Sequence, residues 1–294
     1  MIGRALLLVN PGARRGDRAA GDARASLEAQ GLEVLPTSPG DLDRLGEVIG
    51  RMRGEIDRVV VAGGDGTLNT AVQALVGSGL PIAVLPVGTA NNLARTLRLP
   101  TSLEAACALA AHGELRAIDL GWINGRYFFT TASMGLSVQI SERLSAETKQ
   151  RWGALSYAVV ALRAMVQARP FRAEISWAGG TRQSRTVQIV VGNGRYYGSA
   201  LPVAEDAEID DARLDLYSLE VRHWLGLLAL LPALRRGRHG EKRSVEALRA
   251  AEFEITTNLP LKLNVDGELW GRTPVRCRVV PRALQVFAPA QGST

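Results

Sequence analysis

The sequence predicts an α/β plus all-β fold, with an open parallel α/β domain at the N-terminus and an antiparallel, β-sandwich-like domain with helical insertions at the C-terminus. Short apolar runs alternate with helical patterns up to about residue 119, and hairpin patterns dominate afterwards. The length of 294 residues also suits two domains, because one domain usually takes about 100–200 residues. We expect the domains at residues 1–119 and 120–294, with the last residues free to pack back on the first domain.

In the first domain, each β-type run is followed by a helical pattern. The runs cover residues 5–10, 32–37, 57–62 and 81–86, and the helical patterns cover 18–30, 42–52, 68–76, 92–97 and 103–112. Strict alternation of strand and helix predicts a parallel sheet with helices on its faces. The carboxyl ends of such strands are where open α/β sheets bind ligands.

The second domain is rich in turn dipeptides between β-type runs. Asn124-Gly125, Gly179-Gly180, Asp266-Gly267 and Pro281-Arg282 are the predicted turns. Two apolar helical stretches, 152–166 and 221–244, interrupt the strands and are the expected insertions.

Composition excludes several classes of protein. The hydrophobic fraction of 46% and the charged fraction of 22% are typical of a globular protein rather than a disordered or fibrous one. Cys107 and Cys277 lie far apart, so we expect reduced thiols and no disulfide scaffold. No signal peptide or membrane span is evident, which makes the cytoplasm the expected location. The first domain has no lysine, which excludes a lysine-containing phosphate loop there.

Three polar or glycine-rich turns follow predicted strands of the first domain, at residues 10–17, 63–67 and 88–92. Glycine lets an anionic ligand approach backbone N–H groups, and a helix start adds about half a positive charge. Asp65 would repel a bare phosphate, so it suits contact through Mg²⁺ or a ribose hydroxyl. The structural alternative is a plain strand-to-helix connection with Asp65 or Thr67 as N-cap. Three such turns together predict a nucleotide site.

Several longer motifs give the chain a resemblance to a known family. The motifs are GGDGTLN at 63–69, PVGTANNLA at 86–94, DLGWINGRYFFTTASMGLSVQISE at 119–142, NGRYYGSALPVAEDAEIDDARLDLY at 193–217 and LNVDGELW at 263–270. Together they resemble the soluble diacylglycerol-kinase-type lipid kinases of bacteria, which are related to sphingosine kinases and, more distantly, to NAD kinases and phosphofructokinases. The resemblance extends over nearly the whole chain.

The resemblance implies an ATP- and Mg²⁺-dependent lipid kinase that phosphorylates a lipid hydroxyl. The first expected acceptor is diacylglycerol, and the product would then be phosphatidic acid. ATP would be bound by Asn10, Gly63, Gly64, Asp65, Gly66, Thr67, Gly88, Thr89 and Asn91. Asp65 is also carried over as catalytic. Asp266 and Glu268 would be the catalytic pair, one of them a general base. A structural Mg²⁺ would lie at the acidic loop 208–213, with Asp211 as ligand.

Spacing alone does not decide whether Asp266 and Glu268 are catalytic, because Asp-Gly between two strands is also a common hairpin turn. The chain also departs from the family pattern at three places. Asn92 stands where many members have Asp, Ala13-Arg14 replaces Ser-Gly, and Ala212 replaces a glycine of the acidic loop. These departures put a Mg²⁺-linked carboxylate, the phosphate contacts and the structural metal in question.

The charge distribution suggests a membrane partner. The net charge of +6 arises entirely after residue 118, since the first 118 residues hold 12 basic and 12 acidic side chains. Two apolar stretches are suited to peripheral contact with an anionic membrane at its inner face: residues 152–169, and residues 224–234, which are followed by a basic run. Trp152 and Tyr157 of the first stretch could anchor it at the membrane interface. The structural alternative is two core helices under a basic loop. Nucleic acid is not an expected partner, and a homodimer stays open.

Two other functions remain as alternatives to a lipid kinase. A NAD-kinase-like enzyme would phosphorylate a water-soluble acceptor, and a non-catalytic regulator would bind nucleotide or lipid without turnover. Asp65, Asp266 and Glu268 favour an enzyme, whereas Asn92 is the best support for the regulator.

Overall fold

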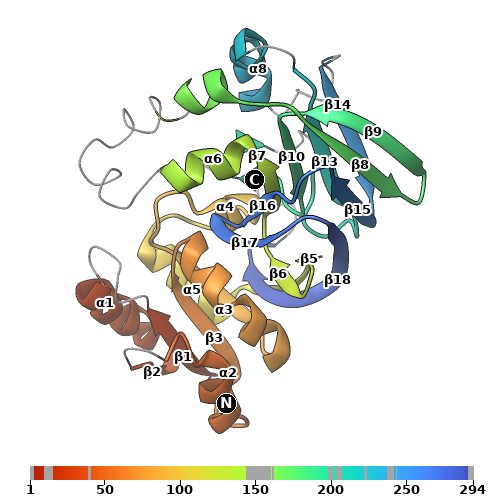
Figure 1. Ribbon diagram of the computed structural model, residues 1–294. Helices are drawn as coiled ribbons and strands as arrows, with labels where there is room; N and C mark the ends of the chain where they lie inside the picture. Colours follow the sequence, from red (N-terminus) through yellow and green to blue (C-terminus); the bar gives the residue numbers. More distant parts are fainter. Residues whose placement is uncertain are drawn as a thin grey trace. The chain divides into compact units, whose positions relative to one another are not determined.

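The computed structural model describes residues 3–9, 16–38, 41–143, 160, 162–197, 201–202, 207–221, 224–236, 242 and 244–290 (Figure 1). The chain divides into two compact units. Unit 1 comprises residues 1–120, 209–211 and 280–294, and unit 2 comprises residues 121–208 and 212–279.

Unit 1 is built on a parallel sheet with the strand order β2-β1-β3-β4. The strands are β1 (Gly3–Val9), β2 (Leu32–Pro36), β3 (Arg58–Gly63) and β4 (Ile82–Pro86), and the last part of β18 (Val275–Ala288) joins beside β4. β3 and β4 are buried almost throughout, as expected for strands covered on both faces. From β1 the chain adds β2 on one side of the sheet and then β3 and β4 on the other, so the strand order reverses between β1 and β3. Open sheets bind ligands at such a switch point.

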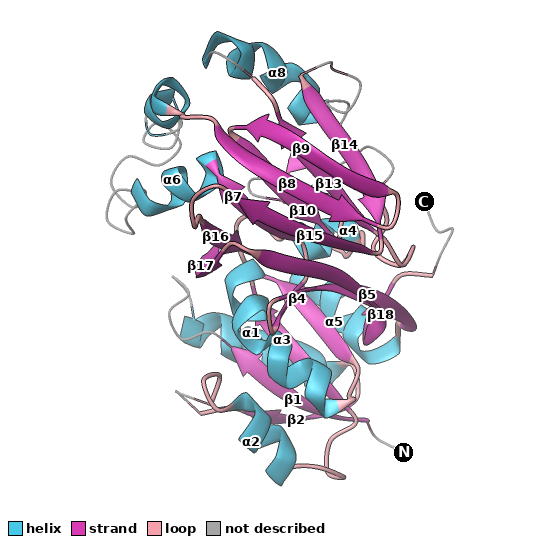
Figure 2. Cartoon of the chain, turned by 45° about the vertical axis from the view of Figure 1, so that its right-hand side comes forward, coloured by secondary structure: helices cyan, strands magenta, loops and turns pink. Residues whose placement is uncertain are grey.

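Helices cover this sheet (Figure 2). The described helices of unit 1 are α1 (Gly16–Ala29), α2 (Leu45–Arg51), α3 (Asp65–Ser78), α4 (Asn92–Thr96) and α5 (Leu103–His112). α1 and α5 share one buried cluster with strand side chains such as Leu7, Val60 and Leu85. α3 packs against β3 and contacts α2. The predicted parallel α/β domain is confirmed.

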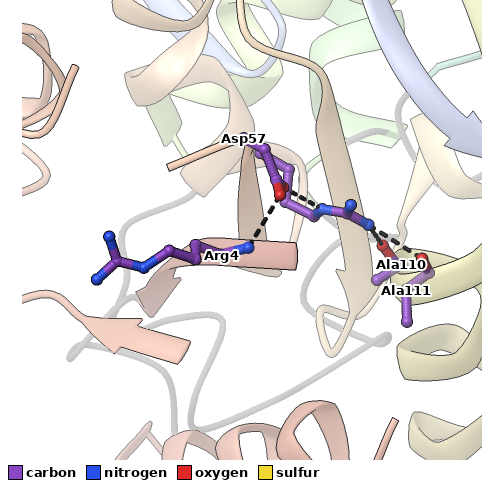
Figure 3. A network of polar contacts seen from close by, with 5 residues as sticks. Arg4, Asp57, Ala110 and Ala111 are labelled. Atoms are coloured by element: carbon purple, nitrogen blue, oxygen red, sulfur yellow. Dashed lines mark hydrogen bonds and ion pairs between the residues drawn. The ribbon is translucent and has the colours of Figure 1, made fainter. Parts of the chain in front are cut away.

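A polar network ties the strands at the end of the sheet away from the glycine-rich turns (Figure 3). The Asp57 carboxylate accepts from the Arg4 N–H at 2.9 Å and from the Arg58 Nε at 2.6 Å. Arg58 also donates to the carbonyls of Ala110 and Ala111 in the last turn of α5. Since these carbonyls lack partners within the helix, the guanidinium satisfies them and anchors α5 to β3.

Unit 2 is antiparallel and sandwich-like, as predicted. One sheet has the order β14-β13-β10-β7-β16-β17, and the strands β18, β15, β8 and β9 pair in that order. The bounds are β7 (Thr131–Gly135), β8 (Phe171–Trp177), β9 (Gly180–Thr186), β10 (Gln188–Gly192), β13 (Leu214–Leu219), β14 (Val245–Ala250), β15 (Glu252–Thr257), β16 (Lys262–Val265) and β17 (Glu268–Arg272). Buried side chains from both groups of strands, among them Met134, Val191, Ile175 and Phe253, form one core.

Two small hairpins and two described helices complete the chain. β5 (Glu114–Ile123) pairs with β6 (Arg126–Phe128), and β11 (Tyr196–Tyr197) pairs with β12 (Leu201–Pro202). The helices are α6 (Leu136–Arg143) and α8 (Trp224–Arg236), and residues 162–167 are also helical. Cys107 and Cys277 are buried free thiols, and burial raises the pKa of Cys277 to about 12.

The structure departs from the sequence patterns at the turn Pro281-Arg282 and at strand β14, among other places. Pro281-Arg282 does not end a strand, because β18 runs through it. Arg282 takes a φ of +52°, and its N–H donates to the buried Asp119 carboxylate at 2.7 Å, which holds the irregular residue within the strand. β14 falls directly after the predicted helical insertion, where its mixed polar sequence gives little strand signal.

Candidate active site

The glycine-rich turn joins β3 to α3 in unit 1. β3 ends at Gly63 and α3 begins at Asp65, three residues before the predicted start. Gly64 is the N-cap residue and no side chain caps the helix, so neither Asp65 nor Thr67 is the N-cap. The first N–H groups of a helix have no acceptor within it, and Gly66 among them is exposed. The start of α3 is therefore suited to bind an anion.

The glycines of the two turns are needed for different structural reasons. A Cβ on Gly88 would lie 2.5 Å from the Cα of Gly64, because the two turns touch backbone to backbone. A Cβ on Gly63 would lie 2.5 Å from the Thr67 hydroxyl oxygen. A Cβ on Gly66, by contrast, would meet no protein atom within 4 Å. Gly63, Gly64 and Gly88 are thus required for the packing of the turns, and Gly66 leaves an open face.

Asp65 links the two turns through hydrogen bonds. Its carboxylate accepts from the Asn92 side-chain amide at 3.2 Å and from the Leu93 N–H at 3.4 Å, at the start of α4. Asn92 is buried, whereas an aspartate there could not donate the first of these bonds. Asn92, which stands where many members of the family have Asp, therefore provides a hydrogen-bond donor to Asp65 in place of a second carboxylate.

The remaining predicted nucleotide residues have mixed outcomes. Asn91 takes a left-handed φ of +49°, and its side-chain amide donates to the carbonyls of Pro86 and Gly88, which closes the second turn. Thr89 is exposed on this turn. Asn10 and Ala13-Arg14 lie outside the described residues, as does most of the turn at 10–17. The structure brings together the turns at 63–67 and 88–92.

Asp266 lies in unit 2, in the tight turn between β16 and β17. Both Asp266 and Gly267 have positive φ, of +47° and +94°, so the predicted hairpin is confirmed. The carboxylate accepts from the N–H groups of Phe129, Thr130 and Thr131 at 2.7–3.0 Å and from the Thr130 hydroxyl at 2.6 Å. Burial nevertheless raises the pKa of Asp266, and these hydrogen bonds oppose that shift. A hairpin turn and a catalytic carboxylate are thus compatible at this residue.

Glu268 begins β17 and is held by a charged partner. The Arg126 guanidinium of β6 donates to its carboxylate at 2.6 Å. The same guanidinium lies 4.7 Å from the centre of the Trp270 ring. The Arg126 side chain is only 13% exposed, whereas that of Glu268 is 44% exposed. Glu268 is therefore accessible but fixed in direction.

Arg126 and Thr130 are the residues of this site that the sequence reasoning missed. Both lie in the segment 126–131, whose side-chain and backbone donors bind the carboxylates of Asp266 and Glu268. The motif NGRYFFTTASMG resembles the family, but its pattern predicts only the Asn-Gly turn. The signal was present in the run of polar residues Thr130 and Thr131 between apolar strands.

Comparison with known proteins identifies the family of the chain. Residues 4–123 match the diacylglycerol kinase catalytic domain, and residues 130–288 match the YegS C-terminal NAD kinase beta sandwich-like domain. The curated diacylglycerol kinase of Mycobacterium tuberculosis is 30% identical, over 99% of this chain and 97% of that protein. The chain belongs to the diacylglycerol kinase family of lipid kinases.

Other relatives extend the comparison. A diacylglycerol kinase of Staphylococcus aureus is 28% identical to this lipid kinase, over 97% of the chain and 92% of that protein. The crystal structure of a diacylglycerol kinase from Bacillus anthracis superposes with a TM-score of 0.74 at 20% identity, over 98% and 97% of the two chains. The latter likeness concerns the fold. Membership in the family makes the chain a kinase that acts on a lipid alcohol with ATP as co-substrate.

The acidic loop of this lipid kinase, residues 208–213, only partly supports the predicted metal site. Arg116 pairs with Asp210 at 2.7 Å, so a protein cation already compensates that carboxylate. Asp211 beside it is partly exposed. Ala212, which replaces the family's glycine, takes a left-handed φ of +57° that glycine adopts more easily. Across the ranges that the structure describes, no three His, Cys, Asp or Glu side chains converge as metal ligands.

The two apolar insertions contain helix at residues 160, 162–166 and 224–236. Ala164, Leu227 and Leu230 are buried in one core cluster, whereas Leu162, Val166 and Leu225 are 44–61% exposed. Each helix thus contributes one face to the core and leaves apolar side chains on another. Among the described residues, no helix is long and apolar enough to cross a membrane. Trp152, Tyr157 and most of the basic run after α8 lie outside the described residues.

Proposed function

We propose that this lipid kinase transfers the γ-phosphoryl group of MgATP to the free hydroxyl of diacylglycerol and releases phosphatidic acid and ADP. The observation that carries this proposal is the carboxylate of Asp266, fixed by four hydrogen bonds and raised in pKa by burial. The relatives named diacylglycerol kinase match nearly the whole chain and support the acceptor.

The nucleotide is proposed to bind at the two turns of unit 1. The uncapped start of α3 supplies N–H donors, and the open face of Gly66 leaves room for phosphate oxygens. Asp65 contributes through its bonds to Asn92 and Leu93, which keep the turns together. Thr89, Asn91 and Asn10 complete the proposed set. Bound together with ATP, Mg²⁺ would supply charge neutralisation at the phosphates. Asp211 as a structural Mg²⁺ ligand stays a prediction.

Asp266 is proposed as the general base. Three of its four hydrogen bonds end on Oδ1, whereas Oδ2 accepts only the Phe129 N–H, so Oδ2 has room for a proton. The lipid hydroxyl gives its proton to Oδ2 while its oxygen forms the bond to the γ-phosphorus. The bond from that phosphorus to the bridging oxygen breaks, and ADP leaves with the electron pair.

A transfer assay with ATP labelled at the γ-phosphate tests this function. The acceptors are diacylglycerol and sphingosine in mixed micelles, and glycerol and NAD in solution with the same micelles present. We expect labelled phosphatidic acid, and a loss of about 10²–10⁴-fold in Asp266→Ala or Asp266→Asn. Asp43→Ala, at an exposed loop carboxylate of unit 1, is the matched control and keeps full activity.

The pH dependence gives a second readout. A base must be ionised to act, so activity is lost as pH falls through the pKa of Asp266. Because burial raises that pKa, the acid limb of kcat/KM is expected above the ordinary aspartate value of about 4. Label on NAD instead of lipid would favour the NAD-kinase-like alternative, and no label on any acceptor would favour a non-catalytic regulator.

We further propose that the enzyme works in the cytoplasm, at the inner face of the membrane, where its lipid substrate resides. Leu162, Val166 and Leu225 are the exposed apolar side chains that support this contact. Arg163 and Arg169 are exposed near the first two and suit anionic headgroups.

A further inference from the structure

One continuous segment of unit 2, residues 129–143, contacts the hairpin between β16 and β17 at two places. The donors of residues 129–131 at its start bind the Asp266 carboxylate. The segment then forms β7 and α6, and α6 packs against β16. Near the end of α6, the Ser141 hydroxyl accepts a hydrogen bond from the Asn264 side-chain amide of β16 at 2.8 Å. The segment is therefore bonded both to the β16–β17 turn and to the strand that leads into it.

Asn264 connects the second of these contacts to the turn itself. Its Oδ1 accepts from the Gly267 N–H at 2.9 Å, while its Nδ2 donates to Ser141. Asn264 is only 8% exposed. Asn side chains that bond a nearby backbone N–H stabilise turns, and this turn holds Asp266 at a φ of +47°, which few residue types adopt easily. The side chain of Asn264 therefore fixes the backbone of the turn and is itself anchored on α6.

The contact between α6 and the sheet is polar, which fixes its alignment. Ser137 and Ser141 lie four residues apart and so share one face of the helix. The Ser137 N–H donates to Gln188 Oε1 at 2.8 Å, and the Ser137 hydroxyl lies 2.9 Å from both Gln188 Nε2 and the Ser133 hydroxyl. Gln188 and Ser133 are each only 5% exposed. A shift of α6 would leave these buried groups without partners, which is costly, so the network favours one position of the helix.

We propose that Asn264 is a positioning residue for phosphoryl transfer: it transmits the alignment of α6 to the Gly267 N–H and so keeps the β16–β17 turn in one conformation during the reaction. The inference rests on the proposed function, because it concerns the same transfer. It holds whichever of Asp266 and Glu268 accepts the proton, since Gly267 lies between them. Displacing a reacting group by about 1 Å can cost about 10²-fold in rate, so the conformation of this turn matters for the transfer.

A second link between α6 and β16 provides a matched control. The Lys262 ammonium pairs with the Glu142 carboxylate at 2.5 Å, and their side chains are 46% and 37% exposed. Lys262→Gln removes this exposed ion pair between the same two elements and leaves the bonds of Asn264 in place. Because exposed pairs contribute little, we expect this variant to keep kcat within about twofold of the wild type.

The test compares Asn264→Ala, Ser141→Ala, Ser141→Thr and the double variant Asn264→Ala/Ser141→Ala in the full chain, with diacylglycerol in mixed micelles and MgATP. Rates are measured well below the unfolding temperature of each variant. We expect kcat to fall about tenfold or more in Asn264→Ala while KM for ATP stays within about twofold, since the turn and not the nucleotide site is altered. Ser141→Ala should lower kcat about threefold, as expected for one hydrogen bond, and Ser141→Thr, which keeps the hydroxyl, should restore it.

The double variant decides whether Ser141 acts through Asn264. We expect its kcat to equal that of Asn264→Ala, because the link is already broken there. The inference is overturned if Ser141→Ala lowers kcat by the same factor in both backgrounds, or if folded Asn264→Ala keeps the wild-type kcat whatever its thermal stability.

The Ser141 variants keep the inference testable if Asn264→Ala fails to fold. Equal kcat in Ser141→Ala, Ser141→Thr and Lys262→Gln would then overturn it, whereas a loss confined to Ser141→Ala would support it. A wild-type chain that transfers label to no acceptor would instead overturn the proposed function, so the two failures are distinguishable.

Discussion

At the scale of single residues, the glycines of the two turns do different work. The sequence interpretation gave all of them one purpose, the approach of phosphate to backbone N–H groups. Their contacts divide them: Gly64 and Gly88 lie against each other, whereas Gly66 faces open space. This division could not be read from the sequence, because it depends on the distance between turns that are separated by more than 20 residues.

The division predicts opposite results for two alanine substitutions. Gly88→Ala forces a Cβ to within 2.5 Å of the Gly64 Cα, so we expect a loss of about 1–3 kcal/mol in the free energy of unfolding. Gly66→Ala lies inside helix α3 with room for a methyl group, so we expect unchanged or slightly higher stability. Its methyl group would still obstruct phosphate, and KM for ATP should rise about tenfold.

Thermal unfolding and steady-state kinetics with varied ATP measure both effects. Gly77→Ala, later in the same helix and also without a neighbour within 4 Å, is the matched control and should leave KM for ATP unchanged. An unchanged KM in Gly66→Ala would mean that phosphate does not bind at the start of α3.

At the scale of elements, sequence patterns located most strands and helices of unit 1 and the tight turns of unit 2. Asn124-Gly125 and Asp266-Gly267 were predictable because both positions of such a turn need positive φ, which these residue types tolerate. The donors around Asp266 were not, because Phe129–Thr131 reach it across more than 130 residues of chain. Local pattern thus predicts the turn, while only tertiary packing reveals the hydrogen bonds that hold its partly buried aspartate.

The link between α3 and α4 carries a prediction at this scale. Asp65 in the first turn of α3 binds the Asn92 amide at the start of α4, so Asn92→Asp would place two carboxylates within about 3 Å of each other. We expect a loss of about 1–3 kcal/mol of stability at pH 8. Repulsion raises the pKa of one member of the new pair in the folded state. The deficit should therefore shrink as pH falls through that raised pKa, when a shared proton restores a hydrogen bond.

Unfolding curves at pH 5 and pH 8, with and without Mg²⁺, measure this effect. Mg²⁺ should stabilise Asn92→Asp more than the wild type, because a cation offsets the new repulsion. Asn92→Leu loses the same hydrogen bond without adding charge, and its deficit should not depend on pH or Mg²⁺. Equal deficits for both variants at both pH values would rule out charge repulsion at this link.

At the scale of the whole molecule, charge and exposed apolar side chains are unevenly distributed between the ends of the chain. The balanced first 118 residues hold the proposed nucleotide turns, and the basic remainder holds the helices that expose Leu162, Val166 and Leu225. The sequence left membrane contact and core packing as alternatives for these helices. The two are compatible, since one face of each helix is buried while another is exposed.

Peripheral membrane contact predicts that the wild-type chain sediments with vesicles that contain anionic phospholipid. Binding should weaken as salt rises from about 0.05 to 0.5 M, because screening removes the attraction of the basic residues. The triple variant Leu162→Ser/Val166→Ser/Leu225→Ser should bind about tenfold or more weakly, since each apolar side chain inserted into the interface contributes on the order of 1 kcal/mol or more. Leu115→Ser is the matched control, because Leu115 is 52% exposed but belongs to unit 1.

The triple variant should also lose more activity on diacylglycerol in vesicles than on diacylglycerol in detergent micelles. In micelles the enzyme does not need to bind a bilayer before it reaches its substrate. Binding that ignores salt, or equal weakening by the triple variant and by Leu115→Ser, would show that these helices are core elements alone.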